Sequence, residues 1–410
     1  MFRRICSENV WNMEKVMRAV ICLFVCLMSS LGALTLDERK EIIRSGVEGI
    51  IQSVDPTALV GVMIYSLDEN VALYERNSEA RFVPASSIKL FTAAAALKCL
   101  GEDDCFETRV MTDGEIQKKV LKGDCYLVGS GDPSLTAMDL LELVEGMGDL
   151  EKIEGDLVLD LSCFEDAPWG PGWMWDEEPA YWCVPMSPLN VEHNFVGDEA
   201  ILEPEKLAAS LFKGILDRKG IVLSGELKIG NVPEGAKNLA SHRSEPIREL
   251  IKVALKNTDN LYANCLFKKM GPSWEKGRNA VEAFLKEHIG LNPEEFVVVD
   301  GSGESRYNLV TPKQMIHFLK KERANRILMD ALAIGGVDGT LRNRMKMFEG
   351  KVKAKTGSMT GVSSICGYLE TDSGKEFAIA IFENGYVREG REIKRKLEDG
   401  ICQMLVNLSD

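Results

Sequence analysis

A serine and a lysine stand three residues apart at the start of an alanine-rich segment. The stretch RFVPASSIKLFTAAAAL places Ser86 and Lys89 just after Pro84. Residues i and i+3 share one face of a helix, so the two side chains can touch. A serine needs a base beside it to become a nucleophile, and a buried lysine that loses its proton can be that base. The spacing therefore predicts a serine nucleophile that a lysine activates.

Two later elements add weight to this S-x-x-K spacing, which alone is common and recurs in SWEK at residues 273–276. NTDNLYAN supplies Thr258 and Asn260 at the head of a helical run, where an ordinary helix cap is the competing interpretation. AKTGS, residues 354–358, lies in an alternating strand, where a glycine would let a substrate backbone lie close. The ordered set S-x-x-K, S/T-x-N and K-T-G is far less expected by accident than any one element, so it predicts a single reaction site.

This ordered set resembles that of the penicillin-binding proteins and serine β-lactamases. Further blocks extend the resemblance to the low-molecular-mass D-alanyl-D-alanine carboxypeptidase/endopeptidases of the S13 peptidase family, often called the penicillin-binding protein 4 type. The blocks are FVPASSIKLFTAAAAL, GSGDPSL, GPGWMWDEEPAYWCVPMSPLNVEHN, DGSGESRYN, GGVDGTLRNR and KAKTGSMTGVSSICGYLET. They run from roughly residue 36 to residue 400, so the resemblance covers most of the chain.

The resemblance implies catalytic roles for the matching residues. Ser86 would be the acylated nucleophile and Lys89 its general base. Thr258 and Asn260 stand where the family has S-x-N, so the hydroxyl would relay a proton to the leaving D-alanine and the amide would hold the substrate's peptide. Lys355 would bind the terminal carboxylate, a task that suits a fixed ammonium group.

The resemblance also implies substrate contacts. Backbone N–H groups of Ser86 and Ser358 would form an oxyanion hole. Arg306 in GSGESRYN and Asp132 in GSGDPSL fall on blocks that, in relatives, contact the diamino-acid side chain of the stem peptide. The expected substrate-binding residues are Thr356, Gly357, Ser358, Arg306 and Asp132.

Two residues depart from the family's pattern. Thr258 replaces the usual serine, which keeps the hydroxyl but adds a methyl group. Glu304 replaces the usual apolar residue of DGSGLSR, and it is expected to place a carboxylate near Arg306 and weaken that arginine's hold on substrate. The rate of reaction and the affinity for β-lactams are therefore expected to differ from those of relatives.

The activity that the resemblance implies is removal of the terminal D-alanine from peptidoglycan stem peptides, with hydrolysis of cross-links as a second activity that the sequence leaves open. No cofactor is implied, and β-lactams should act as covalent inhibitors at the same serine. Two alternatives stay open. One is a serine β-lactamase, for which no motif for a dedicated deacylating glutamate is found, and the other is a catalytically weak or dead scaffold that binds the cell wall.

Both ends of the chain contain strand-like segments, so they are expected to join one sheet. Residues 58–77 read as a β-hairpin and residues 351–386 as three strands, with helical patterns before and after them. The expected fold class is α/β, with a β-lactamase/transpeptidase-like domain of an antiparallel sheet flanked by helices and an inserted, mostly β domain. The expected divisions are a signal peptide at 1–33, a discontinuous catalytic domain at 34–100 and 241–410, and the insertion at 101–240.

The stretch APWGPGWMWDEEPAYWCVP holds four of the six tryptophans. A packed loop whose rings bury against the insertion's own strands is the favoured interpretation. A ligand-binding surface is the alternative.

The N-terminal segment predicts export. Lys15 and Arg18 precede an apolar run that is too short to span a bilayer, followed by small residues, which is typical of a signal peptide cleaved near Gly32 or Ala33. Met13 is a candidate true start. A periplasmic or otherwise extracytoplasmic location is therefore expected.

Composition argues against several other classes of function. The net charge of −14 gives no support to binding of nucleic acid or anionic lipid. Eight cysteines remain after residue 33, without a CxxC motif or a Cys/His cluster of zinc spacing, so no metal site is expected. Cys99 and Cys105 could close a small disulfide loop, although spacing does not fix a pairing. The four histidines show no catalytic pairing pattern and are expected to be structural.

Overall fold

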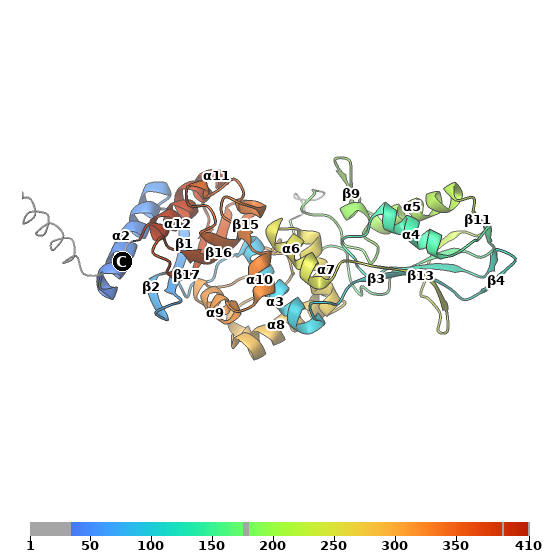
Figure 1. The fold of residues 1–410 in the computed structure, drawn as a ribbon, viewed down its shortest axis with the longest axis horizontal. Helices are drawn as coiled ribbons and strands as arrows, with labels where there is room; N and C mark the ends of the chain where they lie inside the picture. Colours follow the sequence, from blue (N-terminus) through green and yellow to red (C-terminus); the bar gives the residue numbers. More distant parts are fainter. Residues whose placement is uncertain (1–33, 175–179, 388, 409–410) are drawn as a thin grey trace, which may run out of the picture.

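The computed structural model describes residues 34–174, 180–387 and 389–408. The signal peptide expected at residues 1–33 lies outside them. Figure 1 shows an elongated molecule with a large sheet at one end, a group of helices in the middle and a second set of strands at the far end. No helix in the described ranges is long and apolar enough to cross a membrane.

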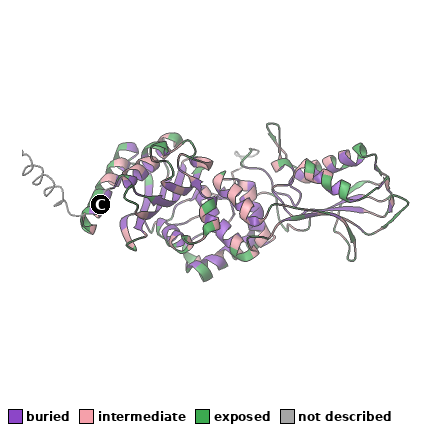
Figure 2. Cartoon of the chain, viewed as in Figure 1, coloured by how far each residue is buried: buried purple, intermediate pink, exposed green. Residues whose placement is uncertain are grey.

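The large sheet has six strands and is antiparallel at every pairing, in the order β14-β15-β16-β17-β1-β2. Strand β1 pairs with β17 from Leu59↔Asn384 to Ser66↔Phe377, which joins the two ends of the chain as expected. The strands are β1 (Leu59–Ser66), β2 (Val71–Arg76), β14 (Ala333–Ile334), β15 (Val352–Met359), β16 (Val362–Glu370) and β17 (Glu376–Asn384). The central strands are buried almost throughout because helices cover both faces (Figure 2).

One face of the sheet packs against the two terminal helical segments. Helix α2 begins at a capping box made by Thr35 and Glu38, and it buries Ile43, Val47 and Ile51 with the C-terminal helices. The other face packs against α9, and behind it lie the helices that carry the reaction site. The helices of this part are α2 (Leu36–Val54), α3 (Lys89–Leu100), α6 (Ile247–Lys256), α7 (Asn260–Met270), α8 (Trp274–Phe284), α9 (Pro312–Glu322), α10 (Arg326–Ala331), α11 (Gly390–Ile393) and α12 (Asp399–Val406).

The far end of the molecule is built from the middle of the chain. Its five-stranded sheet has the order β12-β8-β6-β3-β13, and a four-stranded sheet has the order β11-β7-β5-β4. Helices α4 (Ala137–Gly146) and α5 (Pro204–Arg218) contribute to a separate apolar core with these strands. The strands are β3 (Glu107–Thr112), β4 (Glu115–Gln117), β5 (Val120–Lys122), β6 (Cys125–Val128), β7 (Lys152–Ile153), β8 (Leu157–Asp160), β9 (Phe195–Val196), β10 (Glu199–Ala200), β11 (Val222–Leu223), β12 (Leu227–Ile229) and β13 (Lys237–Arg243).

The tryptophan-rich loop packs differently from the prediction. The ring of Trp173 lies edge-on to Trp274 of α8 at 5.6 Å, and its Nε1 donates to Asp300 Oδ2 at 2.8 Å. Its partners therefore belong to the helical part of the molecule and not to the strands of the insertion, because a polar indole edge needs a buried acceptor. Trp182 is 56% exposed and faces the pocket described below.

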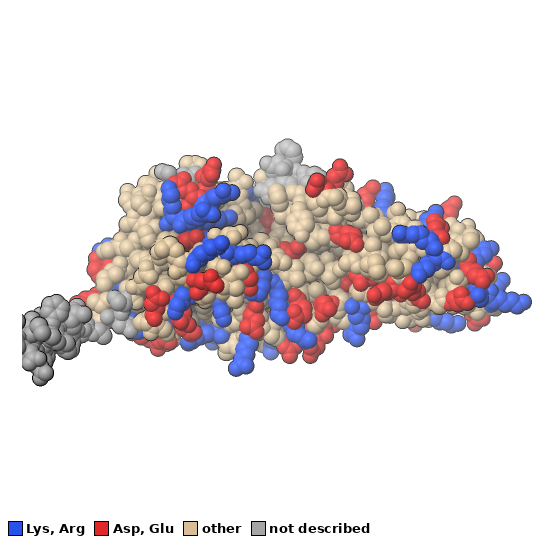
Figure 3. All heavy atoms as spheres, turned by 45° about the horizontal axis from the view of Figure 1, so that its top comes forward, with Lys and Arg blue, Asp and Glu red and all other residues tan. Residues whose placement is uncertain are grey.

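The surface carries charges of both signs along its whole length in the view of Figure 3. None of the eight cysteines among the described residues forms a disulfide, and five of them are buried. Cys265 and Cys366 are among the five, and the disulfide loop that Cys99 and Cys105 could have closed is not formed.

Candidate active site

Ser86 and Lys89 are in contact where a 3-10 turn, η1 (Ala85–Ile88), runs into helix α3. The Lys89 ammonium donates hydrogen bonds to Ser86 Oγ at 2.8 Å, to Asn260 Oδ1 at 2.5 Å and to the carbonyl oxygen of Ser302 at 2.6 Å. All three acceptors are neutral groups. When the amine loses one proton, its lone pair can accept the Ser86 hydroxyl hydrogen at the same place.

Burial lowers the pKa of Lys89 to about 8, because the 1% exposed amine has lost most of its hydration. The carboxylates of Asp300, Glu304 and Asp259 act in the opposite direction and raise the pKa. A measurable share of Lys89 is thus neutral near neutral pH, as a general base requires.

The backbone at the serine is held in a strained form. Ala85 has a φ of 46°, in the left-handed region that a non-glycine residue rarely adopts. Ser364 Oγ donates to the Pro84 carbonyl oxygen at 2.7 Å, which fixes the turn against the sheet. A Cβ atom on Gly357 would lie 2.7 Å from that carbonyl oxygen and 2.3 Å from Ser364 Oγ. Glycine is therefore needed at 357 so that the serine turn can pack on β15, a different reason from the substrate approach that the sequence suggested.

The second predicted element lies at the N-terminus of α7. Asp259 caps the helix by accepting from the Tyr262 N–H at 3.0 Å, so the helix-cap interpretation holds for this residue. Thr258 has a φ of 58° and accepts a hydrogen bond from Lys355 Nζ at 2.7 Å. Lys355 is fully buried, and burial together with the charge of Lys89 holds its pKa well below the usual value.

Asn260 connects the lysine to a buried carboxyl group. Its Oδ1 accepts from Lys89, and its Nδ2 donates to the Trp182 carbonyl oxygen at 2.8 Å and to Glu304 Oε2 at 2.6 Å. Burial raises the pKa of Glu304 to about 8. The sequence placed this carboxylate near Arg306, but its carboxyl group bonds to Asn260 and Cys183. Arg306 Nη1 donates to the Thr360 carbonyl oxygen at 3.1 Å.

A pocket of about 320 Å³ opens over these groups. Its lining residues are Ser86, Trp182, Thr258, Asn260, Gly303, Glu304, Ser358, Met359 and Thr360. Lys89 and Lys355 are buried and reach its lining through their hydrogen bonds to Ser86 and Thr258. Thr356 is nearly buried and shares a hydrogen bond of 2.7 Å with Thr340.

Asp132 is not among the residues that line this pocket. It is 1% exposed, and its Oδ1 accepts from the Ser134 N–H and hydroxyl at 2.8 and 2.6 Å. Its role in substrate binding stays a prediction.

A second pocket of about 490 Å³ is lined in part by Thr258, Asp259 and Asn260. His193 lines it, with its Nε2 2.9 Å from Asp259 Oδ2 and its ring stacked on Tyr181 at 4.5 Å. His193 thus supports the cap that positions Asn260. Nothing in the local sequence distinguished it from the other histidines.

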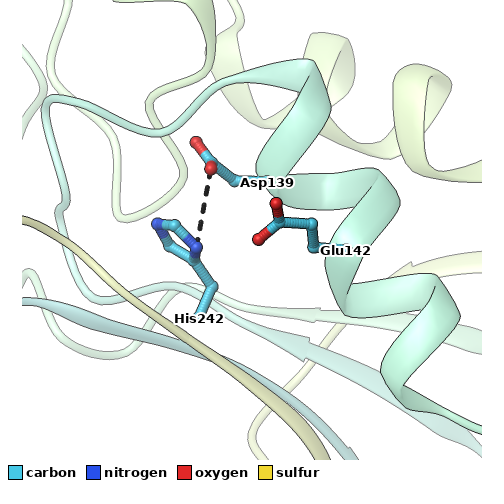
Figure 4. A group of neighbouring side chains, drawn as sticks. All are labelled: Asp139, Glu142 and His242. Carbon is cyan, nitrogen blue, oxygen red and sulfur yellow. Dashed lines mark ion pairs between the residues drawn. The ribbon is translucent and has the colours of Figure 1, made fainter.

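Within the described part of the chain, one group of side chains has the geometry to hold a cation, although the sequence gave no reason to expect a metal site. Asp139 and Glu142, one turn apart on α4, face His242 of β13 (Figure 4), and their candidate ligand atoms lie within 4.8 Å of one another. Asp139 Oδ1 is 3.6 Å from His242 Nδ1. Glu142 is exposed, and the group lies among the strands and helices at the far end of the molecule and not in the pocket of Ser86.

Comparisons of sequence place the chain among peptidases. It matches the profile of the D-Ala-D-Ala carboxypeptidase 3 (S13) family over residues 44–201 and 198–408. D-alanyl-D-alanine carboxypeptidase DacB of Haemophilus influenzae is 27% identical over 433 aligned residues, which cover 85% of this chain and 90% of that protein. The D-alanyl-D-alanine carboxypeptidase of Actinomadura sp. is 28% identical, with 84% and 81% covered.

Solved structures agree with this assignment. The crystal structure of penicillin binding protein 4 from Haemophilus influenzae superimposes with a TM-score of 0.81 at 26% identity, covering 87% of this chain and 98% of that one. The same protein complexed with a novel β-lactam gives a TM-score of 0.75. A predatory peptidoglycan endopeptidase from Bdellovibrio bacteriovorus, 18% identical, shares the fold with a TM-score of 0.60 and coverage of 85% and 93%. The expected fold class is confirmed.

Proposed function

Because the chain belongs to the D-Ala-D-Ala carboxypeptidase 3 (S13) family, we propose that it hydrolyses peptides ending in D-Ala-D-Ala through an acyl-enzyme on Ser86. The observation that carries this proposal is the contact of 2.8 Å between Ser86 Oγ and a buried lysine whose pKa is about 8. The pair lies where a substrate carbonyl can reach the serine, because Ser86 lines the open pocket.

In the acylation step, the Lys89 amine takes the Ser86 hydroxyl proton as Oγ attacks the carbonyl carbon of the penultimate D-alanine. The C–N bond to the terminal D-alanine then breaks, and the leaving nitrogen takes a proton through the Thr258 hydroxyl, which Lys355 holds in place. Water releases the acyl group in the second step and regenerates Ser86.

Charged side chains near Ser86 are proposed to recognise the substrate. Lys355, with Thr356 and Gly357 in the same strand, is proposed to bind the terminal carboxylate. Arg306 and Asp132 are proposed to contact the side chain of the stem peptide. Ser86 and Ser358 both line the pocket, and the N–H groups of these two serines are the proposed oxyanion hole.

The proposal extends to the whole chain. A signal peptide at 1–33 would direct the protein outside the cytoplasm, where peptidoglycan and β-lactams are its partners. Residues 34–100 and 241–410 would form the catalytic domain and residues 101–240 the insertion. The separate apolar core of the middle segment supports this division.

Intact-mass spectrometry after incubation with benzylpenicillin tests the proposal, with Ser86→Ala as the matched control. We expect one adduct of the mass of the drug on the wild type, none on the variant, and release of D-alanine from a D-Ala-D-Ala peptide by the wild type alone. An adduct that is shed within seconds would identify a β-lactamase. No adduct and no consumption of penicillin would contradict the proposal and favour a scaffold protein.

A further inference from the structure

Glu304 is a buried carboxyl group with few hydrogen-bond donors. It is 5% exposed, and it lines the pocket of Ser86. Its Oε2 accepts from Asn260, and the Cys183 thiol also bonds to the carboxyl group. No N–H or O–H donor among the described residues reaches Oε1. A buried carboxylate needs donors for both oxygens, so this site suits the protonated form.

Asp300, four residues before Glu304, is a buried carboxyl group that does receive hydrogen bonds at both oxygens. It is fully buried, and its Oδ1 accepts from the Gly303 N–H at 2.9 Å and from Asn308 Nδ2 at 2.7 Å. Its Oδ2 accepts from the Ser305 N–H and from Trp173 Nε1, both at 2.8 Å. The loop therefore provides a full set of donors to one carboxylate and leaves the neighbouring one short of them.

Glu304 is linked to Lys89 through a single amide. Asn260 accepts from Lys89 and donates to Glu304, so the orientation of this amide depends on both groups. Asp300 and Asp259 also face Lys89 and favour its charged form, whereas Lys355 and Lys89 repel one another. The pKa values of Lys89 and Glu304 are both about 8, so the two groups change charge over the same pH range.

We propose that Glu304 governs the protonation of Lys89: its carboxylate holds Lys89 as the ammonium, and its protonated form leaves Lys89 free to become the amine that accepts the Ser86 proton. This inference rests on the proposed function, since it concerns the base of that reaction. Glu304 acts through Lys89 and Asn260 and is thus a positioning residue.

The two titrations are coupled, which gives the proposal a distinctive signature. At low pH Glu304 is protonated and Lys89 behaves as it would without a neighbouring carboxylate. As Glu304 ionises, attraction between the charges favours the ammonium, so the reactive amine accumulates slowly over a broad range of pH. Replacing Glu304 with glutamine keeps an acceptor for Asn260 but removes the carboxyl group that titrates. Lys89 should then lose its proton along the curve of a single group, with a lower midpoint.

The test is the second-order rate of Ser86 acylation by benzylpenicillin, measured from pH 5 to pH 10. For Glu304→Gln we expect the rate to rise more steeply with pH and the midpoint of this rise to fall by about half a unit, which makes the variant about 1.5-fold faster near pH 8 and equal to the wild type at pH 5. Glu304→Leu also removes the acceptor for Asn260, so comparing the two variants separates titration from hydrogen bonding. Glu234→Gln, at an exposed glutamate outside the pocket, is the control and should follow the wild type.

If the acylation rate of Glu304→Gln rises with pH along the same curve as that of the wild type, and only the overall rate differs, the proposal is overturned. Glu304 would then have only a structural role. NMR titration of the Lys89 amine in protein labelled at the lysine ε-carbons gives the same test without acylation. A lower Lys89 midpoint in Glu304→Gln supports the proposal, and an unchanged midpoint overturns it. Absence of acylation in the wild type would instead count against the proposed function.

Discussion

Lys89 and Lys268 are both buried, and they lie at opposite ends of one group of helices, but their partners differ. Lys268, near the C-terminus of α7, forms an ion pair with Asp166 and lies over the rings of Phe164 and Trp274. Lys89 donates to a hydroxyl, an amide and a carbonyl, and it forms no ion pair with any described residue. A carboxylate in contact keeps an ammonium charged, whereas neutral acceptors satisfy its hydrogen bonds without opposing the loss of a proton. Of these two lysines, Lys268 is held as an ammonium by its carboxylate, whereas the neutral partners of Lys89 leave it free to serve as the proposed base.

The largest expected effect comes from removing the unpaired lysine. Lys89→Met should lower the acylation rate by about 10³-fold, because the general base is lost. It should leave the melting temperature unchanged or higher, since a buried amine without an ionic partner gives way to an apolar chain of similar length. Acylation kinetics and thermal unfolding of the same sample check both parts. A variant that acylates at the wild-type rate would assign the base elsewhere.

A second change would give Lys89 the kind of partner that Lys268 has. Asn260→Asp is nearly isosteric and puts a carboxylate at the position 2.5 Å from Lys89 Nζ. The pKa of Lys89 should rise by about 1–3 units, so acylation at pH 7 should fall by about 10²-fold and recover in part at higher pH. Asn260→Ala also loses the amide but gains no charge, so its rate should not recover at high pH. The ratio of rates at pH 7 and pH 10 distinguishes the two variants.

A third change removes Lys268, the lysine that forms an ion pair with Asp166. Lys268→Met leaves Asp166 without its partner and should lower the free energy of unfolding by about 3 kcal/mol, with acylation of the folded protein within a few-fold of the wild type. Urea denaturation measures the first quantity and mass spectrometry the second. Asp166→Asn should also destabilise. Stability equal to that of the wild type in both variants would remove the contrast between the two lysines.

The smallest effect is expected for the change of Thr258 to serine. Its φ of 58° is costly for a β-branched residue, and its hydroxyl is held by Lys355. Thr258→Ser keeps the hydroxyl and should acylate within about 3-fold of the wild type, whereas Thr258→Ala should lose about 10²-fold. Steady-state release of D-alanine by both variants is the measurement. If Thr258→Ser and Thr258→Ala release D-alanine equally fast, the Thr258 hydroxyl does not transfer the proton to the leaving nitrogen.

The sequence predicted several groups that the structure brings together, because spacing and order specify Ser86, Lys89, Asn260 and Lys355 directly. It also predicted that both chain ends share a sheet, since hydrophobic alternation is a local signal. It did not predict the contacts made by backbone carbonyl groups, such as Ser302 to Lys89, because every residue has one. The partner of Glu304 was also missed. That carboxyl group turns toward Asn260 in a loop whose Gly303 has a φ of 82°, a path that residue types do not specify.

In the tryptophan-rich loop, too, residue types did not specify the contact partners. Composition indicated that Trp173 would be buried, and it is partly buried in contact with Trp274. The partner could not be inferred, because the nearest acceptor for its indole lies more than a hundred residues away in the chain, at Asp300.

The most direct test of the account is the titration of Lys89 in the wild type, followed by NMR of protein with labelled lysine ε-carbons and assigned by the loss of one signal in Lys89→Arg. We expect a midpoint near pH 8, coincident with the rise in the acylation rate. A midpoint at the ordinary lysine value of about 10.4 would contradict this expectation, because Lys89 would then be an ammonium wherever Ser86 reacts.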